Sequence, residues 1–398
     1  MENKKIFYFL LFNFLFYMIG KGQNPIVQKI LNEVNMDSLT FFVKQLTGEE
    51  KVIINGIPDT IFSRHKNQPG NEKAFQFVKQ KFLGYGLQID SFQFSASGKN
   101  LLGIKIGSIY PTRKFILGAH YDNVGSTIAP GADDNASGSA AVLEAARVFS
   151  ESTFPFTIVF ALWDEEEQGL IGSNAYSSFA VSNNETILGY INMDMLGWDG
   201  NNDSVADLHV RPVANSLQLA DKAIESNSVY AIGLNLHIVN PGTGATDHAA
   251  FWDNGYTAIG INEEYDGDFN PFWHSSADSL GQFNLPFYEK CAKLAYATLA
   301  DCALDSIISS GISDVWEQPP FIIYPNPASA KLNIEIGSVY HNNSIIQLTD
   351  VLGKIYYQEL LLNKNSLEIN LQNLQSGFYI IKFNNGQNSY SSTLVINK

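Results

Sequence analysis

Short apolar runs alternate with longer segments of helical periodicity over the first three quarters of the chain. Helical spacing of apolar residues occurs at 24–46, 71–88, 137–150 and 285–303. Apolar segments of strand length lie between them, at 88–94, 101–107, 114–120, 156–163, 186–197 and 256–262. Strands that alternate with helices in this way predict an α/β fold, with a mixed, largely parallel sheet flanked by helices.

The pattern changes after residue 305. Residues 306–321 lose periodicity and gain Ser, Gly and Pro, which indicates a linker. Residues 322–398 alternate β-forming and polar residues between Gly and Asn-Gly turns, which predicts a small all-β sandwich domain. The main α/β domain is therefore expected to span residues 23–305.

The start of the chain has the pattern of a secretory signal peptide. Two lysines precede an apolar run from Ile6 to about Ile19, and small residues follow it. The run is short for a membrane span and ends abruptly. We therefore expect residues 1–22 to direct export of the protein.

Composition excludes some classes of protein. The chain has 398 residues, of which 45% are hydrophobic, so a globular fold is expected. The net charge of −15 argues against a nucleic-acid partner, because such a protein would have a basic surface. The cysteines are Cys291 and Cys302, eleven positions apart on one predicted helix, which separates them by roughly 16 Å. A disulfide requires a much shorter distance, so both are expected to be free thiols.

Polar residues collect where the predicted strands end, and where a helix begins. Taken singly, each has an ordinary structural interpretation, such as a helix cap or a solvated surface. Because the carboxyl ends of parallel strands share one edge of a sheet, these side chains are expected to lie together. Histidines and carboxylates are ligands that zinc accepts. The residues are His120, Asp122, Asp133, Asp134, Glu166, Glu167, Asp194 and His274.

Two adjacent pairs in this set raise the question of which member acts. Glu166 and Glu167 are expected to point in different directions, so one can bind metal while the other transfers a proton. Asp133 and Asp134 lie among small residues, which leave space for cations that would offset the repulsion between the two carboxylates. The residue pattern alone does not distinguish the two aspartates.

Five segments in order, "GAHYDN", "GADDNASG", "EEQGLIGS", "INMDMLG" and "FWHSSAD", resemble the secreted di-zinc aminopeptidases of the leucyl-aminopeptidase type, metallopeptidase family twenty-eight. The resemblance covers roughly residues 60–303 and implies a zinc exopeptidase fold that binds two Zn²⁺ ions. It implies that Asp134, rather than Asp133, bridges the ions and is followed by a cis peptide bond to Asn135. The other implied ligands are His120 and Asp194 for one ion and Glu167 and His274 for the other, with Glu166 as the general acid/base.

The same resemblance suggests supporting roles for further residues. It implies that Asp122 orients His120 and that Asp278 orients His274. It places Asp247 and His248, in "GATDHAAF", near the substrate cleft. Thr243 and Trp273 occupy the usual places of a tyrosine that stabilises the tetrahedral intermediate, so Tyr265 is a candidate substitute. The candidates for recognition of the substrate α-amine are Glu263 and Glu264.

The tail resembles a C-terminal sorting domain of the type IX secretion pathway. The segments that carry this resemblance are "IIYPNPAS", "LQSGFYIIKF" and "STLVINK". It implies that residues 322–398 interact with the type IX secretion machinery. The protein is then expected to be secreted or attached to the cell surface.

Together these features predict a secreted metallo-aminopeptidase. It would hydrolyse N-terminal residues from peptides or proteins with a free N-terminus, through a water molecule activated by two metal ions. One alternative is a glutaminyl cyclase-like acyltransferase with a single zinc, and another is an inactive binding scaffold. The complete set of five ligands and the presence of Glu166 argue against both.

Overall fold

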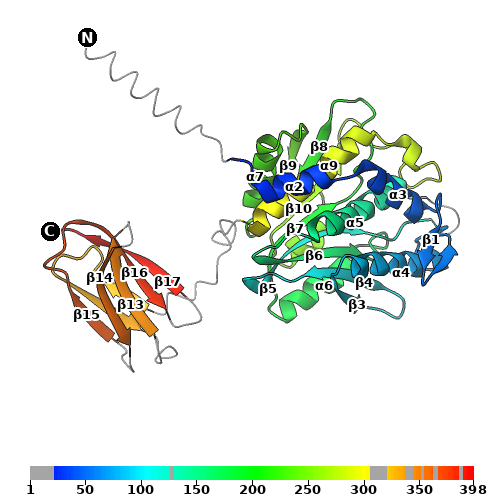
Figure 1. Cartoon of the computed structure of the whole chain (residues 1–398). Coiled ribbons are helices and arrows are strands. Elements are labelled where there is room, and N and C mark those ends of the chain that lie inside the picture. Colours follow the sequence, from blue (N-terminus) through cyan, green and yellow to red (C-terminus); the bar gives the residue numbers. More distant parts are fainter. Residues whose placement is uncertain are drawn as a thin grey trace, which may run out of the picture. The chain divides into compact units, whose positions relative to one another are not determined.

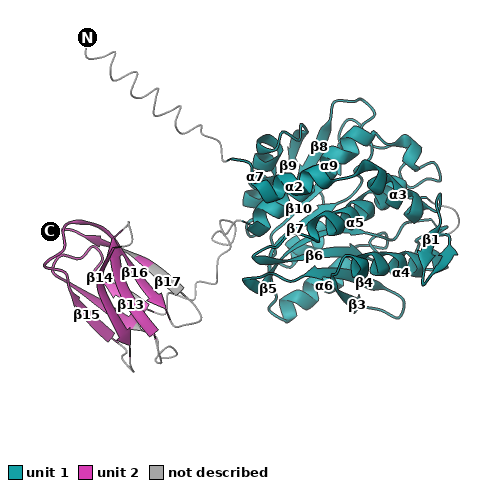
Figure 2. Cartoon of the chain, in the orientation of Figure 1, with its two compact units in different colours: residues 1–312 teal, residues 313–398 magenta. Residues whose placement is uncertain are grey.

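The computed structural model describes residues 22–125, 130–304, 321–336, 344–350, 354–361, 366–384 and 389–398. The chain forms two compact units, residues 1–312 and 313–398 (Figure 2). The predicted signal peptide, apart from Gly22, and the predicted linker, apart from Phe321, lie outside the described residues. Within the described residues, no helix combines the length and hydropathy that a membrane crossing requires.

The first unit contains an eight-stranded sheet with helices on both faces (Figure 1). Its helices are α2 (Pro25–Glu33), α3 (Met36–Thr47), α4 (Pro69–Gly84), α5 (Gly138–Phe149), α6 (Ile171–Ser182), α7 (Ser216–Val229), α8 (His248–Asp253) and α9 (Leu285–Leu304). The short segments η1 (Ala132–Ser137) and η2 (Leu280–Gln282) are also helical turns. The strands of the sheet are β3 (Gln88–Gln93), β4 (Lys99–Lys105), β5 (Tyr110–His120), β6 (Phe156–Trp163), β7 (Thr186–Met193), β8 (Val205–His209), β9 (Asn235–Val239) and β10 (Ala258–Glu263). Strands β1 (Val52–Ile54) and β2 (Ile57–Asp59) form a separate antiparallel hairpin.

The strand order is β3-β4-β6-β5-β7-β10-β8-β9. The central strands β6, β5, β7 and β10 are parallel to one another. The pairs β3–β4, β4–β6 and β10–β8 are antiparallel. The sheet is therefore mixed and largely parallel at its centre, as the sequence predicted. Four carboxyl ends of neighbouring parallel strands meet at one edge.

Alternate residues of the central strands pack on opposite faces of the sheet, because side chains along a strand alternate with a period of two. Phe115 and Leu117 of β5 belong to a cluster with α2, α3, α4, α5, α7 and α9. Ile116 belongs to the cluster on the other face, with α6 and α8. Burial on both faces explains why these strands are continuously apolar in the sequence.

The first predicted helix is divided into two. Residues 24–46 have one helical pattern, but the structure ends α2 at Glu33 and starts α3 at Met36. The Asn35 side chain accepts a hydrogen bond from Ser38 N at 3.0 Å, so it caps a new helix. The Asn35 N–H also donates to Glu144 Oε1 at 2.8 Å, which fixes the break against α5.

The second unit is an all-β domain with its own hydrophobic core. Its strands are β11 (Phe321–Tyr324), β12 (Lys331–Ile336), β13 (Ser344–Asp350), β14 (Ile355–Leu361), β15 (Ser366–Asn370), β16 (Gly377–Asn384) and β17 (Ser389–Ile396). They form a three-stranded sheet, β11-β12-β15, and a four-stranded sheet, β14-β13-β16-β17, with antiparallel pairing throughout. This agrees with the predicted all-β domain. Cys291 and Cys302, both on α9, are buried thiols that form no disulfide, also as predicted.

Close packing of η1 and α5 against β7 depends on a glycine at residue 138. A Cβ atom at Gly138 would clash with the Met193 backbone oxygen and with Asn135 Oδ1. The Gly138 N–H donates to Asn135 Oδ1 at 2.8 Å, and Asn135 Nδ2 donates to the Met193 oxygen at 2.9 Å. A larger residue would therefore force η1 away from the edge of the sheet.

We predict that Gly138→Ala lowers the free energy of unfolding by about 1–3 kcal/mol, because fixed atoms surround the added methyl group. Urea unfolding followed by tryptophan fluorescence measures this, since all five tryptophans precede residue 322. Gly84→Ala is the matched control, because nothing lies within 4 Å of its added Cβ. That control should be neutral or stabilising by up to about 1 kcal/mol. Equal stability of the two variants would contradict the proposed packing constraint.

Candidate metal centre and active site

Six of the side chains singled out in the sequence converge at the carboxyl edge of the central strands. They come from the end of β5, the loop after β6, the residue after β7, η1, and the segment between β10 and α9. In that order they are His120, Glu166 and Glu167, Asp194, Asp134, and His274. All six line one pocket of about 670 Å³.

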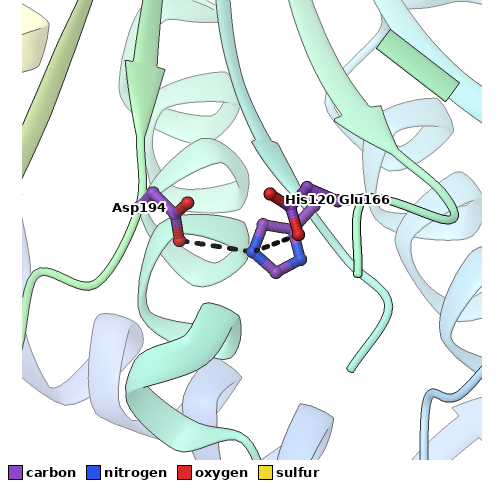
Figure 3. A group of neighbouring side chains, drawn as sticks. All are labelled: His120, Glu166 and Asp194. Atoms are coloured by element: carbon purple, nitrogen blue, oxygen red, sulfur yellow. Dashed lines mark hydrogen bonds and ion pairs between the residues drawn. The ribbon is translucent and has the colours of Figure 1, made fainter. Parts of the chain in front are cut away.

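Asp134 lies between the two histidines and presents one carboxylate oxygen to each. Its Oδ1 is 3.2 Å from His120 Nε2, and its Oδ2 is 3.1 Å from His274 Nε2. Each histidine meets one further carboxylate: Asp194 Oδ1 is 3.2 Å from His120 Nε2 (Figure 3), and Glu167 Oε2 is 3.2 Å from His274 Nε2. The site thus consists of two groups of ligating atoms that share Asp134.

Glu166 lies beside the His120 group but farther from it (Figure 3). Its Oε2 is 3.9 Å from His120 Nε2. The backbone N–H groups of Glu166 and Glu167 donate to the two oxygens of Asp122 at 3.1 and 3.3 Å. Asp122 Oδ1 is also 3.4 Å from His120 Nδ1, as expected of a residue that orients His120. Asp122 therefore joins the end of β5 to the loop that carries both glutamates.

The carboxylates create a strongly negative field in this pocket. Burial raises the pKa of Glu167 to about 7, and the neighbouring Asp134 charge adds to this rise. Burial alone would lower the pKa of His274, but hydrogen bonds to Asp134 and Glu167 outweigh it and raise the pKa to about 9. Burial also acts to lower the pKa of His120, but the charges of Glu166 and Asp194 outweigh burial, so the pKa of His120 is raised. The field favours positive charge at the histidine nitrogens, where a cation would also be attracted.

The donor set fits a divalent cation such as zinc. Ligand atoms lie within 4.8 Å of one another in two sets, His120 with Glu166 and Asp194, and His120 with Asp134 and Glu167. The buried Glu167 Oε1 has no hydrogen-bond partner among the described residues. Imidazole nitrogens and carboxylate oxygens are the donors that zinc accepts, and buried carboxylates gathered this closely require positive charge.

The neighbouring Asp133 faces a different environment. Its Oδ1 accepts from Gly197 N at 2.7 Å, and its Oδ2 accepts from Asn270 Nδ2 at 2.8 Å. Asp134 and the next residue have non-helical backbone angles, and the peptide bond between Asp134 and Asn135 is cis, as the family resemblance implied. The kink directs two adjacent carboxylates to opposite surroundings.

The carboxylate of Asp278 fixes this kink and does not serve to orient His274. Its Oδ1 and Oδ2 accept from the backbone N–H groups of Asp133 and Asp134 at 2.9 and 3.1 Å. The expectation that Asp278 orients His274 is therefore wrong. The short distance of four residues along the chain suggested that pairing, but the loop folds back so that the carboxylate reaches η1 instead.

Sequence reasoning did not identify Arg64, which is fully buried beneath the site. Its guanidinium donates to the backbone oxygens of Tyr121, Pro130 and Gly131 at 2.8–2.9 Å. It therefore fixes the segment after β5 against the start of η1. The negative charge of Asp278 favours the charged form of Arg64, although burial lowers its pKa to about 10.

The other predicted substrate-binding residues divide into two groups. Tyr265 lines the pocket. Asp247 and His248, expected near the substrate cleft, follow the pocket residue Thr246 but are fully buried and do not line the pocket, so neither is placed to bind substrate directly. Glu263 is also fully buried, and its Oε1 accepts from Asn270 N at 3.0 Å. Glu263 and Glu264 are both absent from the pocket lining, so neither is placed to recognise a substrate amine there.

The remaining pocket lining is largely apolar or small. The apolar side chains are Leu170, Met195, Phe269 and Trp273. The Trp273 ring stacks on the His274 ring with 3.6 Å between centroids, and Phe269 packs edge-on against Trp273 at 5.4 Å. Residues 243–246 form a further part of the pocket wall. A substrate in this pocket would therefore meet both carboxylates and apolar surface.

Two family models match the two units. Residues 103–299 match Peptidase family M28, and residues 322–397 match the Secretion system C-terminal sorting domain. Leupeptin-inactivating enzyme 1 of Streptomyces exfoliatus is 30% identical over 247 residues, a match that covers 56% of this chain and 53% of that relative. A probable leucine aminopeptidase of Trichophyton verrucosum (strain HKI 0517) is 28% identical over 261 residues, covering 61% of this chain and 69% of the relative. This chain thus spans about half of one curated relative and about two thirds of the other.

The fold is shared with solved structures. The LapA aminopeptidase of Legionella pneumophila superimposes with a TM-score of 0.62 and 23% identity, covering 70% of this chain and 74% of LapA. At that identity the likeness concerns the fold. The family matches, the order of the elements and the histidine–carboxylate centre agree with one another. The chain therefore carries a domain of peptidase family M28, followed by a secretion system C-terminal sorting domain.

Proposed function

We propose that this protein is a secreted zinc-dependent aminopeptidase that removes N-terminal residues from peptides. The observation that carries the proposal is the position of Asp134, with one oxygen toward His120 and the other toward His274. A carboxylate shared between two ligand groups is suited to bridge a pair of cations. The family match and the names of the aminopeptidase relatives support the same activity.

His120 and Asp194 would hold one zinc ion, Glu167 and His274 the other, and Asp134 both. Bound zinc supplies a Lewis acid and allows water to act as a nucleophile at neutral pH. Glu166 is the group left beside the ligands, on a loop fixed by Asp122. In this proposal it accepts a proton from the attacking water and returns it to the leaving amine.

Tyr265 is the proposed hydrogen-bond donor to the substrate oxygen. Its hydroxyl accepts from Asn262 Nδ2 at 2.7 Å, which leaves the phenolic hydrogen available to the pocket. The same Asn262 amide donates to the Asp194 backbone oxygen at 2.7 Å, so Tyr265 is tied to the residue after β7. Burial keeps its pKa well above the ordinary value, so the phenol remains a donor at neutral pH.

A free substrate N-terminus would be attracted by the carboxylates of the pocket. The acids that line it are Asp134, Glu166, Glu167 and Asp194. Since these are the proposed ligands and proton-transfer group, recognition of the amine and the chemistry would occur at the same place. An endopeptidase substrate would bring no positive charge there, which favours cleavage at the N-terminus.

The C-terminal unit would deliver the enzyme to the cell exterior. Its match to a sorting domain supports recognition by the type IX secretion machinery. Its separate core, and the position of every proposed ligand before residue 275, support a role apart from catalysis.

Glu166→Gln should lower kcat by about 10²–10⁴-fold, because it removes only the proton-transfer group. Hydrolysis of leucyl-nitroanilide and elemental analysis of zinc measure the two expected properties, low turnover and normal metal content. Glu165→Gln is the control, because Glu165 Oε2 lies 3.4 Å from Lys66 Nζ and its side chain is not part of the pocket lining. Activity of Glu166→Gln within threefold of wild type, at normal zinc content, would exclude the proposed role.

Asp134→Asn should lose at least one zinc ion per chain and nearly all activity, because it removes negative charge from both ligand groups. Asp133→Asn should keep its zinc, although the buried amide would face the donors Gly197 N and Asn270 Nδ2 and lower stability. Elemental analysis after dialysis distinguishes the two variants. Equal loss of zinc would mean that the wrong aspartate is assigned as the bridge.

A chain that ends near residue 310 should hydrolyse peptides but remain within the cell envelope of its native host. The full-length Glu166→Gln variant is the control, since it should be exported without being active. Immunodetection of both proteins in cell and medium fractions measures export. Normal release of the shortened chain would contradict the sorting role of residues 322–398.

A further inference from the structure

The pocket wall formed by residues 243–246 has no regular secondary structure and is held by side chains of neighbouring elements. It lies between β9 and α8. The Gly242 backbone oxygen accepts from Arg211 Nε and from its terminal nitrogen at 3.1 and 3.0 Å. The next residue is Thr243. One buried histidine binds its backbone N–H, and a second buried histidine binds its backbone oxygen.

His209 lies at the end of β8 and holds the Thr243 amide. Thr243 N–H donates to His209 Nδ1 at 3.2 Å. An amide nitrogen only donates, so Nδ1 must be unprotonated and the ring hydrogen lies on Nε2. The nearest carboxylate to that nitrogen is Asp207, with Oδ2 at 3.9 Å. Asp207 is already bonded to His237 Nδ1 at 2.8 Å and to Tyr265 N at 2.9 Å.

His248, at the start of α8, holds the Thr243 carbonyl. Its Nε2 is 3.2 Å from the Thr243 oxygen, which can only accept, so Nε2 carries the hydrogen. Its Nδ1 then accepts from the Thr246 hydroxyl at 2.6 Å. Thr246 Oγ1 in turn accepts from Asn192 Nδ2 at 3.2 Å, within β7. One histidine therefore fixes both ends of the pocket wall and connects it to the strand that precedes Asp194.

Both rings are neutral in this arrangement, and their surroundings favour that state. The two rings stack with 5.9 Å between centroids, so protonating one would place a charge against the other. Burial lowers the pKa of His209 to about 4. Burial also lowers the pKa of His248, and positive charge at His209 and Arg211 lowers it further. The hydrogen-bond pattern therefore persists across the neutral range of pH.

We propose that His209 and His248 are positioning residues that determine substrate selectivity by clamping Thr243 in the pocket wall. The inference rests on the proposed aminopeptidase function. Neither ring lines the pocket or lies among the proposed zinc ligands, so the clamp would act through the wall alone. A rigid wall favours substrate side chains large enough to pack against it, and a loosened wall loses that preference.

The test compares two substitutions of His248 in the zinc-loaded full chain. Glutamine can keep a donor near the position of Nε2, whereas phenylalanine keeps a ring and loses both hydrogen bonds. For His248→Phe we expect kcat/KM on leucyl-nitroanilide to fall about tenfold, mainly because KM rises. The value of kcat/KM on alanyl-nitroanilide should change less than twofold. His248→Gln should stay within threefold of wild type on both substrates, and zinc content should be normal in both variants.

Hydrogen–deuterium exchange supplies a readout that requires no turnover. The Thr243 amide should exchange about tenfold faster in His248→Phe than in wild type, and His248→Gln should be intermediate. If His248→Phe fails to fold, His209→Leu and His209→Asn carry the same comparison, because asparagine keeps an acceptor near the position of Nδ1.

The outcomes separate this inference from the proposed function. Wild-type protein that cleaves no aminoacyl-nitroanilide contradicts the aminopeptidase function, whereas the exchange experiment still tests the clamp. If the Thr243 amide exchanges at the wild-type rate in both His248→Phe and His209→Leu, the clamp itself is overturned. Faster exchange with an unchanged leucine-to-alanine ratio overturns its role in selectivity.

Discussion

Repulsion among buried carboxylates is the constraint on which the rest of the first unit depends. Asp122, Asp133, Asp134, Asp194 and Asp278 are all buried at one edge of the sheet, together with Glu166. Asp122 and Asp278 accept hydrogen bonds from backbone N–H groups. Asp133 accepts from the Gly197 N–H and from the Asn270 side chain. Of the others, Asp134 and Asp194 face the histidines together with the half-buried Glu167, and Glu166 lies beside them. The carboxylates that fix the backbone are thereby separated from those available to bind cations.

The fold makes this separation possible because four parallel strands end at the same edge. The ends of β5, β6 and β7 deliver one or two side chains each, while η1 supplies Asp134 through a kink that needs the small Gly138 beside it. Arg64 adds the one buried positive group described beneath this edge, and it binds backbone oxygens rather than a carboxylate. Burial lowers the pKa of Arg64, and the charges of Asp278, Asp122, Asp134 and Glu167 oppose that shift, so Arg64 offsets part of the negative charge at this edge.

The sequence predicted the strands and the ligand candidates for related reasons. Buried central strands are continuous apolar runs, and a charged residue such as Asp194 directly after one is conspicuous. Asp278 was misassigned because residues 264–279 have no periodic pattern that would indicate where its side chain points. Glu263 was misassigned because it ends β10, where its buried carboxylate accepts from the Asn270 N–H. Arg64 escaped notice because its partners are backbone oxygens about 60 residues away, which leave no trace in residue type. The choice of Asp134 over Asp133 came from the family resemblance, and its bridging role remains a prediction.

In the proposed enzyme, the chemistry and the selection of the substrate side chain would be carried by different parts of the first unit. The proposed ligands follow the parallel strands β5, β6, β7 and β10, whereas the wall at residues 243–246 is held from β8 and α8. One hydrogen bond that joins the two parts runs from Asn192 of β7 to Thr246 of the wall. Substitutions in the wall can therefore alter which substrates fit without changing the charges at the metal centre. This division provides a physical route by which one histidine–carboxylate centre could serve enzymes of different selectivity.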